Sequence, residues 1–314
     1  MARSKRPSLV HQATERIKSY DCRGQSRHKL KQEYREQIED KGKTVKSTRV
    51  PGKITGDQTF KNYLSRSINF VRWVKANYPE VKWLEEIEKR HIEIVNAYID
   101  YLNKQLSPFT IHGYIAGVSM LLRTSNTDYD LPPKSYKDIT KNRIDPDAPR
   151  EGFDHAMHQE LLKFIKATGL RYIELCRVRP EQVVKDIYGT VKIEIVANQA
   201  KGGRPRIVLP IAEDAEWVYE YARARQAAGK DRLFSKRDGE LPKYCPYHPA
   251  RAVFAERKYA EAVISHGTGE IYTRRGDGRK FDKGALQELS SNLGHNRLGI
   301  CVQNYLWRPV GWDV

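Results

Sequence analysis

Residues 168–175 read Thr-Gly-Leu-Arg-Tyr-Ile-Glu-Leu and join two stretches, 154–167 and 170–178, whose apolar spacing predicts helices. Arg171 lies at this junction, with Glu174 three residues later. The planar guanidinium group of arginine donates two parallel hydrogen bonds and stays charged at physiological pH, so it is suited to hold a phosphate. A single arginine is usually an ordinary surface residue. The stretch gains meaning from three others further along the chain.

The second stretch is His248-Pro249-Ala250-Arg251, the only H-x-x-R in the chain. Residues three apart share one face of a helix. Proline is favoured in a first helical turn, which puts His248 at or near an N-cap, where unpaired N–H groups also favour a phosphate. An isolated match of this kind is common by chance, and a capping histidine beside a solvated arginine is the alternative.

The third stretch is Lys201-Gly202-Gly203-Arg204, between two β-branched runs. The glycines allow positive φ, so the sequence predicts a hairpin whose tip can reach into a DNA groove. A lysine there can deliver a proton to a leaving oxygen. The alternatives are a solvated turn lysine, or contacts from Lys201 and Arg204 to backbone phosphates alone.

The fourth stretch is Leu293-Gly294-His295, followed by Tyr305 about three turns later. Gly294 marks a turn into the helix that carries Tyr305. A phenol is a weak nucleophile at neutral pH, so it needs an electropositive pocket. Cutting DNA without a metal requires such a nucleophile, cations around the phosphate and a proton donor for the leaving oxygen. The four stretches supply these groups in order.

Together the four stretches resemble the tyrosine recombinase family, the phage-type integrases. The resemblance covers a catalytic domain at 151–314, and the helical segment 57–126 is similar to the family's core-binding (SAM-like) domain. It implies a mainly α fold with a small antiparallel sheet, and two domains that form a clamp around duplex DNA. It also implies a homotetramer on two specific sites, strand exchange through a Holliday junction, and no metal or nucleotide cofactor.

The resemblance assigns a role to each residue of the motifs. Tyr305 would attack the scissile phosphate and form a 3′-phosphotyrosyl link. Arg171 and Arg251 would hold the phosphate, and Lys201 would act as general acid. The remaining roles are those of His248 as acid/base partner, His295 on a non-bridging oxygen, and Glu174 as a brace for the first arginine.

Three features depart from the family pattern. Between Arg251 and His295 lie about twenty more residues than compact members have, an insert at 265–284. Its basic segment gives four candidate DNA contacts, Arg274, Arg275, Arg279 and Lys280, in a hairpin or in a solvated loop. Tyr305 comes one residue later than expected. Only residues 306–314 follow it, with tryptophans that dock on a neighbouring subunit or on their own domain.

The rest of the chain has a simpler pattern. Residues 1–56 form a basic N-terminal extension with helical patches at 10–19 and 27–40, either a flexible tail or an arm along DNA. Apolar stripes at 57–126 predict helices, with Ser107-Pro108 starting the last one. Segment 127–150 has no periodicity and is interpreted as a linker. Further on, 183–187, 191–196 and 206–209 predict three antiparallel strands, and helices follow at 213–228, 249–264, 283–292 and 299–306.

Composition agrees with a nucleic-acid partner. The 314 residues carry a formal net charge of +17 at pH 7, which favours phosphate binding with counterion release. No apolar run reaches the ~20 residues that span a bilayer, and no signal-peptide core is present. We expect a cytoplasmic, nucleoid-associated protein. The four cysteines have no disulfide or zinc spacing.

Two alternative functions remain open at this point. A type IB topoisomerase-like or telomere-resolving enzyme would share the nucleophile and the arginines. A catalytically silent DNA-binding regulator would share the fold alone. The extended basic N-terminus favours an integrase or excision recombinase of a mobile element over a housekeeping resolvase, and the DNA site cannot be deduced from the sequence.

Overall fold

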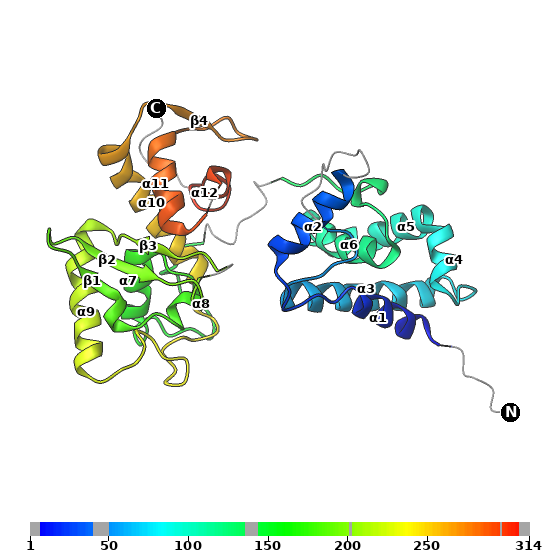
Figure 1. Cartoon of the computed structure of the whole chain (residues 1–314), viewed down its shortest axis with the longest axis horizontal. Coiled ribbons are helices and arrows are strands. Elements are labelled where there is room, and N and C mark those ends of the chain that lie inside the picture. The colour runs from blue at the N-terminus through cyan, green and yellow to red at the C-terminus, as the bar shows by residue number, and fades with distance from the viewer. Residues whose placement is uncertain (1–6, 40–49, 136–143, 201–202, 296, 308–314) are drawn as a thin grey trace. The chain divides into compact units, whose positions relative to one another are not determined.

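A computed structural model describes residues 7–39, 50–135, 144–200, 203–295 and 297–307. The chain divides into two compact units, Met1–Lys134 and Ser135–Val314 (Figure 1). This division falls inside the segment 127–150 that was interpreted as a linker. In the described part of the chain, no helix has the length and apolar character needed to cross a membrane.

Among its described residues, the first unit contains helices and one isolated β-bridge, between Asp21 and Ile54. Its α-helices are α1 (Leu9–Ser19), α2 (Arg27–Glu39), α3 (Asp57–Asn77), α4 (Leu84–Lys89), α5 (His91–Asn103) and α6 (Pro108–Leu122). The three apolar stripes predicted between 57 and 126 are buried on α3, α5 and α6 and share one core. Pro108 is the first residue of α6, as predicted, although the Ser107 Oγ pairs with Thr110 Oγ1 and not with a backbone N–H.

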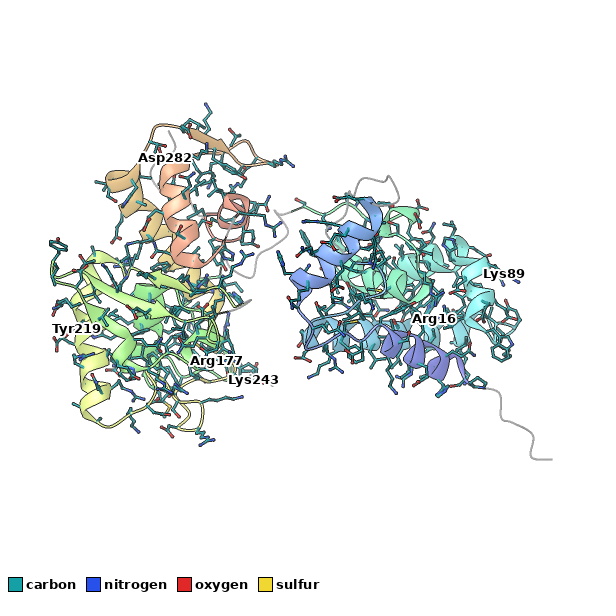
Figure 2. The ribbon with its side chains drawn as sticks, viewed as in Figure 1. Arg16, Lys89, Arg177, Tyr219, Lys243 and Asp282 are labelled. Atoms are coloured by element: carbon teal, nitrogen blue, oxygen red, sulfur yellow. The ribbon has the colours of Figure 1, made fainter. Side chains whose placement is uncertain are left out.

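Helix α1 belongs to this core, so the helical unit begins well before residue 57. Leu9, Ala13 and Ile17 recur on one face of α1 and are buried against α3 and α6. Arg16, labelled in Figure 2, forms an ion pair with Glu88. The sequence predicts this helix as part of the basic extension, because three apolar positions among charged residues are a weak signal of a core helix. In contrast, α2 buries none of its residues.

In the part that the structure describes, the second unit combines six α-helices with two small sheets. The helices are α7 (Gln159–Thr168), α8 (Tyr172–Leu175), α9 (Ala215–Ala227), α10 (Tyr247–His266), α11 (Lys283–Leu293) and α12 (Leu298–Asn304). The antiparallel sheet runs in the order β1 (Val183–Lys185), β2 (Val191–Ile195), β3 (Arg206–Val208), as predicted. Two further strands, β4 (Ile271–Thr273) and β5 (Lys280–Asp282), pair as a hairpin. The insert is therefore a hairpin and not an irregular loop.

Helix α10 links the two cores of this unit. One core is formed by residues of α7, α9 and the three-stranded sheet, and the other is formed by residues of α10, α11 and α12. α10 packs against both α7 and α11 (Figure 1). Arg251, the fifth residue of α10, contacts the carbonyls of Gly169 and Leu293 at the ends of α7 and α11.

Replacing Ile17 by alanine tests whether α1 is part of the first unit's core. We expect a loss of about 2–5 kcal/mol in local stability, because the change removes buried methyl groups and leaves a cavity. Hydrogen exchange of α3 and α6 amides measures this loss. His11→Ala, at an exposed position of the same helix, should change stability by less than about 0.5 kcal/mol. Equal effects of the two variants would contradict the assignment.

Candidate active site

Arg171 lies where the chain passes from α7 to α8. α7 ends at Thr168, and Gly169 follows in the left-handed conformation with φ 61°. A Cβ on Gly169 would lie 2.2 Å from Cδ1 of Phe254, so this turn requires glycine on two counts. The turn makes Arg171 the N-cap of α8. Its backbone N–H donates to Glu174 Oε2 over 2.8 Å, and its Nη1 donates to Oε1 over 2.9 Å.

Glu174 is fully buried between two arginines. The second is Arg206 on β3, whose Nη1 and Nη2 each donate to one Glu174 oxygen over 2.8 Å. Burial alone raises the pKa of Glu174, but the hydrogen bonds and charges of Arg206 and Arg171 outweigh it and lower the pKa to about 2. Glu174 is thus an ionised brace.

Arg206 is not among the predicted site residues, since the sequence predicts it only as the first residue of a strand. The structure shows why this arginine points inward, because side chains two apart on a strand share a face. Arg206 shares a face with Val208, which is buried, while the apolar Ile207 between them is exposed. An arginine on the inward face of a strand is a candidate for a buried ion pair.

Arg251 comes from the first turns of α10 and is 1% exposed. Its Nη1 donates to the Gly169 carbonyl, its Nη2 to the Leu293 carbonyl over 2.7 Å, and its Nε to the Tyr305 hydroxyl over 3.3 Å. Burial lowers the pKa of Arg251. His248 is the second residue of α10, near the N-cap as predicted, and it is exposed.

The end of α11 joins the two predicted arginines. Nη2 of Arg171 donates to the Leu293 carbonyl over 2.7 Å, the same oxygen that accepts from Arg251. Gly294 then ends the helix with φ 65°. Its missing side chain leaves room for Arg206, whose Cδ would lie 3.0 Å from a Cβ at this position.

His295 follows this turn and is held by its backbone. Its N–H donates to the Ser290 carbonyl over 2.8 Å, and the Ser290 hydroxyl donates to the His295 carbonyl over 2.6 Å. Its Nε2 is buried and has no hydrogen-bond partner among the described residues. Burial, followed by the charges of Arg251 and Arg171, lowers the pKa of His295 to about 3. The imidazole is therefore neutral at physiological pH.

Tyr305 directly follows α12 and is 8% exposed. Its ring centroid lies 5.9 Å from that of His295 and 5.6 Å from the guanidinium carbon of Arg251. The phenol thus joins the arginines of its own chain.

The assembled cluster has an excess of positive charge. Arg171 and Arg206 share the single carboxylate of Glu174, and Arg251 donates to no carboxylate in the contacts described. The three guanidinium groups thus exceed the acidic partners in these contacts by two positive charges. Arg251 uses three of the five N–H groups that a guanidinium carries. Buried cations and an unpartnered ring nitrogen suit an anion with several oxygens, such as a phosphodiester.

The other predicted site residues differ in how far the structure describes them and in how exposed they are. Lys201 lies outside the described residues. Arg204, Arg275 and Lys280 are exposed on loops and on the β4–β5 hairpin, and Arg279 donates to the Trp307 carbonyl over 3.2 Å. Arg274 corrects the prediction of a DNA contact: it is 2% exposed, forms an ion pair with Asp277 and donates to carbonyls near Tyr305. A run of basic residues in the sequence does not reveal which side chain points inward.

Comparison with solved structures identifies the fold. The XerH site-specific recombinase, in its post-cleavage complex with palindromic difH substrate, matches 94% of this chain and 89% of its own, with a TM-score of 0.50 and 14% identity. The XerA recombinase matches 90% and 95% at a TM-score of 0.29 and 16% identity. The Tn1549 transposon integrase, in complex with transposon right end DNA, matches 88% and 94% at 0.38 and 14%.

The chain therefore has the tyrosine recombinase fold. The XerH match spans nearly the whole of both chains, at 14% identity. No protein-family model matches the sequence, and no curated protein sequence matches it.

The low pKa of His295 makes the free protein less stable in acid. Below pH 6.5 the imidazole of the unfolded chain binds a proton that the folded chain does not take up until about pH 3. This contribution to stability is thus complete above pH 6.5 and is lost as the pH falls towards 3, with a slope of at most ~1.4 kcal/mol per pH unit.

The variant His295→Gln should remove this slope, as urea denaturation between pH 4 and 7 would measure. The exposed His266→Gln is the matched control and should keep it. A His295→Gln curve parallel to that of wild type would refute a buried neutral imidazole.

Proposed function

We propose that the chain is a site-specific DNA recombinase that cuts and rejoins duplex DNA through a covalent tyrosine intermediate. The observation that carries this proposal is the convergence of Arg171, Arg251, His295 and Tyr305 on one cationic cluster. The tyrosine recombinase fold and the net charge of +17 support it independently.

In the proposed reaction, the Tyr305 oxygen attacks the scissile phosphorus. A 3′-phosphotyrosyl bond forms as the bond to the 5′ oxygen breaks. Arg251 already donates to the phenol oxygen, so its positive charge favours the negative charge that develops there. Arg171 and Arg251 then hold the non-bridging oxygens through their remaining N–H groups. The link conserves the energy of the broken bond, so rejoining needs no nucleotide.

The other polar groups take the supporting roles. The neutral ring of His295 donates its Nε2–H to a non-bridging oxygen, which would give this buried atom a partner. Glu174 keeps Arg171 in orientation. We assign proton delivery to the 5′ oxygen to Lys201. To His248, at the exposed start of α10, we assign the acid/base role that accepts the phenol proton of Tyr305 as the new bond forms.

Tyr305 contacts Arg251 of the same chain, so each subunit would cut with its own tyrosine. The finer proposal is a homotetramer on two specific sites that passes through a Holliday junction, as an integrase or excision recombinase of a mobile element. It rests on the family resemblance of the motifs.

Replacing Tyr305 by phenylalanine tests the central assignment. A suicide DNA substrate, nicked near the scissile phosphate, traps the covalent adduct, which denaturing electrophoresis detects. We expect wild type to form the adduct and Tyr305→Phe to form none, because the attacking oxygen is absent. DNA affinity should remain within about twofold of wild type.

The matched control is Tyr188→Phe, which removes the hydroxyl of a tyrosine that is 86% exposed. It should form adduct at the wild-type rate. Tight binding of wild type without adduct would favour a silent DNA-binding regulator. Relaxation of supercoiled plasmid that lacks a target site would favour a topoisomerase-like enzyme.

Binding should also weaken steeply with salt, by roughly 0.9 powers of concentration for each phosphate contact. The exposed Arg275 and Lys280 are the remaining candidate contacts of the hairpin. In the double variant Arg275→Met/Lys280→Met, we expect the slope of log K for DNA binding against log salt concentration to decrease in magnitude by about 1 for each lost contact. The exposed Arg237→Met is the control for loss of charge. Equal slopes in all three proteins would exclude these contacts.

A further inference from the structure

The β4–β5 hairpin carries two buried charged side chains, Arg274 and Asp282, that the proposed chemistry does not use. Its strands pair Ile271 with Asp282 and Thr273 with Lys280. At its base, the carboxylate of Asp282, labelled in Figure 2, accepts from the N–H groups of Thr268, Gly269 and Ala285 over 2.8–3.0 Å. The hairpin is thus firmly joined to the start of α11. Arg274 begins its turn.

Arg274 reaches the end of α12. Its Nη1 donates to the carbonyl of Val302 over 2.8 Å and to the carbonyl of Leu306 over 2.9 Å. These two carbonyls lie three residues before Tyr305 and one residue after it. The last carbonyls of a helix have no partner within the helix, so Arg274 satisfies groups that would otherwise need water or another donor.

The charge of Arg274 is balanced inside the hairpin. Nε donates to Asp277 Oδ1 over 2.8 Å, and Nη2 contacts Oδ2. The hydrogen bond from Arg274 is the main reason that the pKa of Asp277 falls to about 2, so this carboxylate is ionised at physiological pH. The guanidinium carbon also lies 4.0 Å from the ring centroid of Trp307. Arg279 adds a bond to the Trp307 carbonyl.

Tyr305 itself has little regular structure to hold it. α12 has only seven residues, and a helix this short is unstable without tertiary contacts. Tyr305 follows it with φ −122° and ψ −42°, outside the helix. The position of its phenol therefore depends on how firmly residues 302–307 are held, and the hairpin contacts this segment on both sides of the tyrosine.

We propose that the β4–β5 hairpin is a positioning device for the nucleophile, in which Arg274 fixes the backbone on both sides of Tyr305 and keeps the phenol beside Arg251. The proposal rests on the proposed function of Tyr305. Arg274 touches neither DNA nor the reacting atoms in this scheme. It acts through the geometry of the tyrosine.

The first test separates chemistry from binding. The rate of adduct formation is measured in single turnover at saturating suicide substrate, beside the Kd for DNA. Arg274→Met should slow adduct formation by about 100-fold, the typical effect of misplacing a reacting group by 1 Å. Its Kd should stay within about twofold of wild type. Arg237→Met loses the same charge at an exposed site and should match wild type in both.

Two milder variants guard against misfolding. Arg274→Lys keeps a cation that can pair with Asp277 and donate to a carbonyl, so it should recover at least about tenfold of the lost rate. Asp277→Asn leaves Arg274 in place without its ionic partner and should be slower than wild type by about tenfold. If both milder variants react at the wild-type rate, the positioning role is wrong.

The second test replaces the nucleophile. In the Tyr305→Phe background, hydrogen peroxide supplies a small anionic nucleophile that attacks phosphorus and releases the 5′ oxygen as a hydroxyl group. If Arg274 acts only on the tyrosine, Tyr305→Phe/Arg274→Met should be cleaved with peroxide at the same rate as Tyr305→Phe. Peroxide cleavage lost only with Arg274→Met would mean that the arginine supports the whole site, and would overturn the proposal.

The outcomes separate this proposal from the function on which it rests. Wild type that forms no adduct would overturn the proposed function, and the positioning role with it. A wild-type adduct that Arg274→Met forms equally fast, or a parallel loss of affinity and rate, would overturn only the positioning role.

Discussion

A single backbone oxygen, the carbonyl of Leu293, organises the candidate active site. It accepts hydrogen bonds from Arg171 and from Arg251, each over 2.7 Å. The two arginines come from positions eighty residues apart, and their like charges repel each other. A shared acceptor fixes their separation in spite of that repulsion. Any shift at the end of α11 would move both arginines together.

The buried carboxylate of Glu174 supports this arrangement from the other side. It neutralises one charge among three arginines, and Arg206 extends its hold to β3. Removing one partner of a buried ion pair typically costs about 3–5 kcal/mol. The site is therefore also a junction on which the packing of α8, α11 and β3 depends. Residues that serve chemistry and stability together are costly to vary.

Much of this fold could be predicted, because its signals are local. Apolar stripes located α3, α5 and α6, and β-branched runs between turns located the three-stranded sheet. Gly294 marked the turn after α11, and Pro249 marked the start of α10. The motifs also named the residues that the structure brings together around Arg251.

The features that escaped prediction depend on side-chain direction or on distant partners. Helix α1 is core only because α3 and α6 cover it, which a short charged sequence does not reveal. Arg274 is buried and the Arg206 side chain is only 9% exposed, yet in the sequence they are two basic residues among 56. Burial of a charge is decided by an acidic partner elsewhere, here Glu174 and Asp277. Composition counts such charges but does not pair them.

The two left-handed glycines have an electrostatic consequence. Gly169 ends α7 and Gly294 ends α11, so both helices present their carboxyl ends, the negative pole of the helix dipole, to Arg171 and Arg251. These ends contribute partial charges only, and the one full negative charge in contact with the pair is that of Glu174 on Arg171. Acidic side chains in the same places would have cancelled the cations outright. Because peptide dipoles hold these cations, the local electrostatic potential stays positive. An approaching polyanion is therefore attracted by charge that the protein itself has not neutralised.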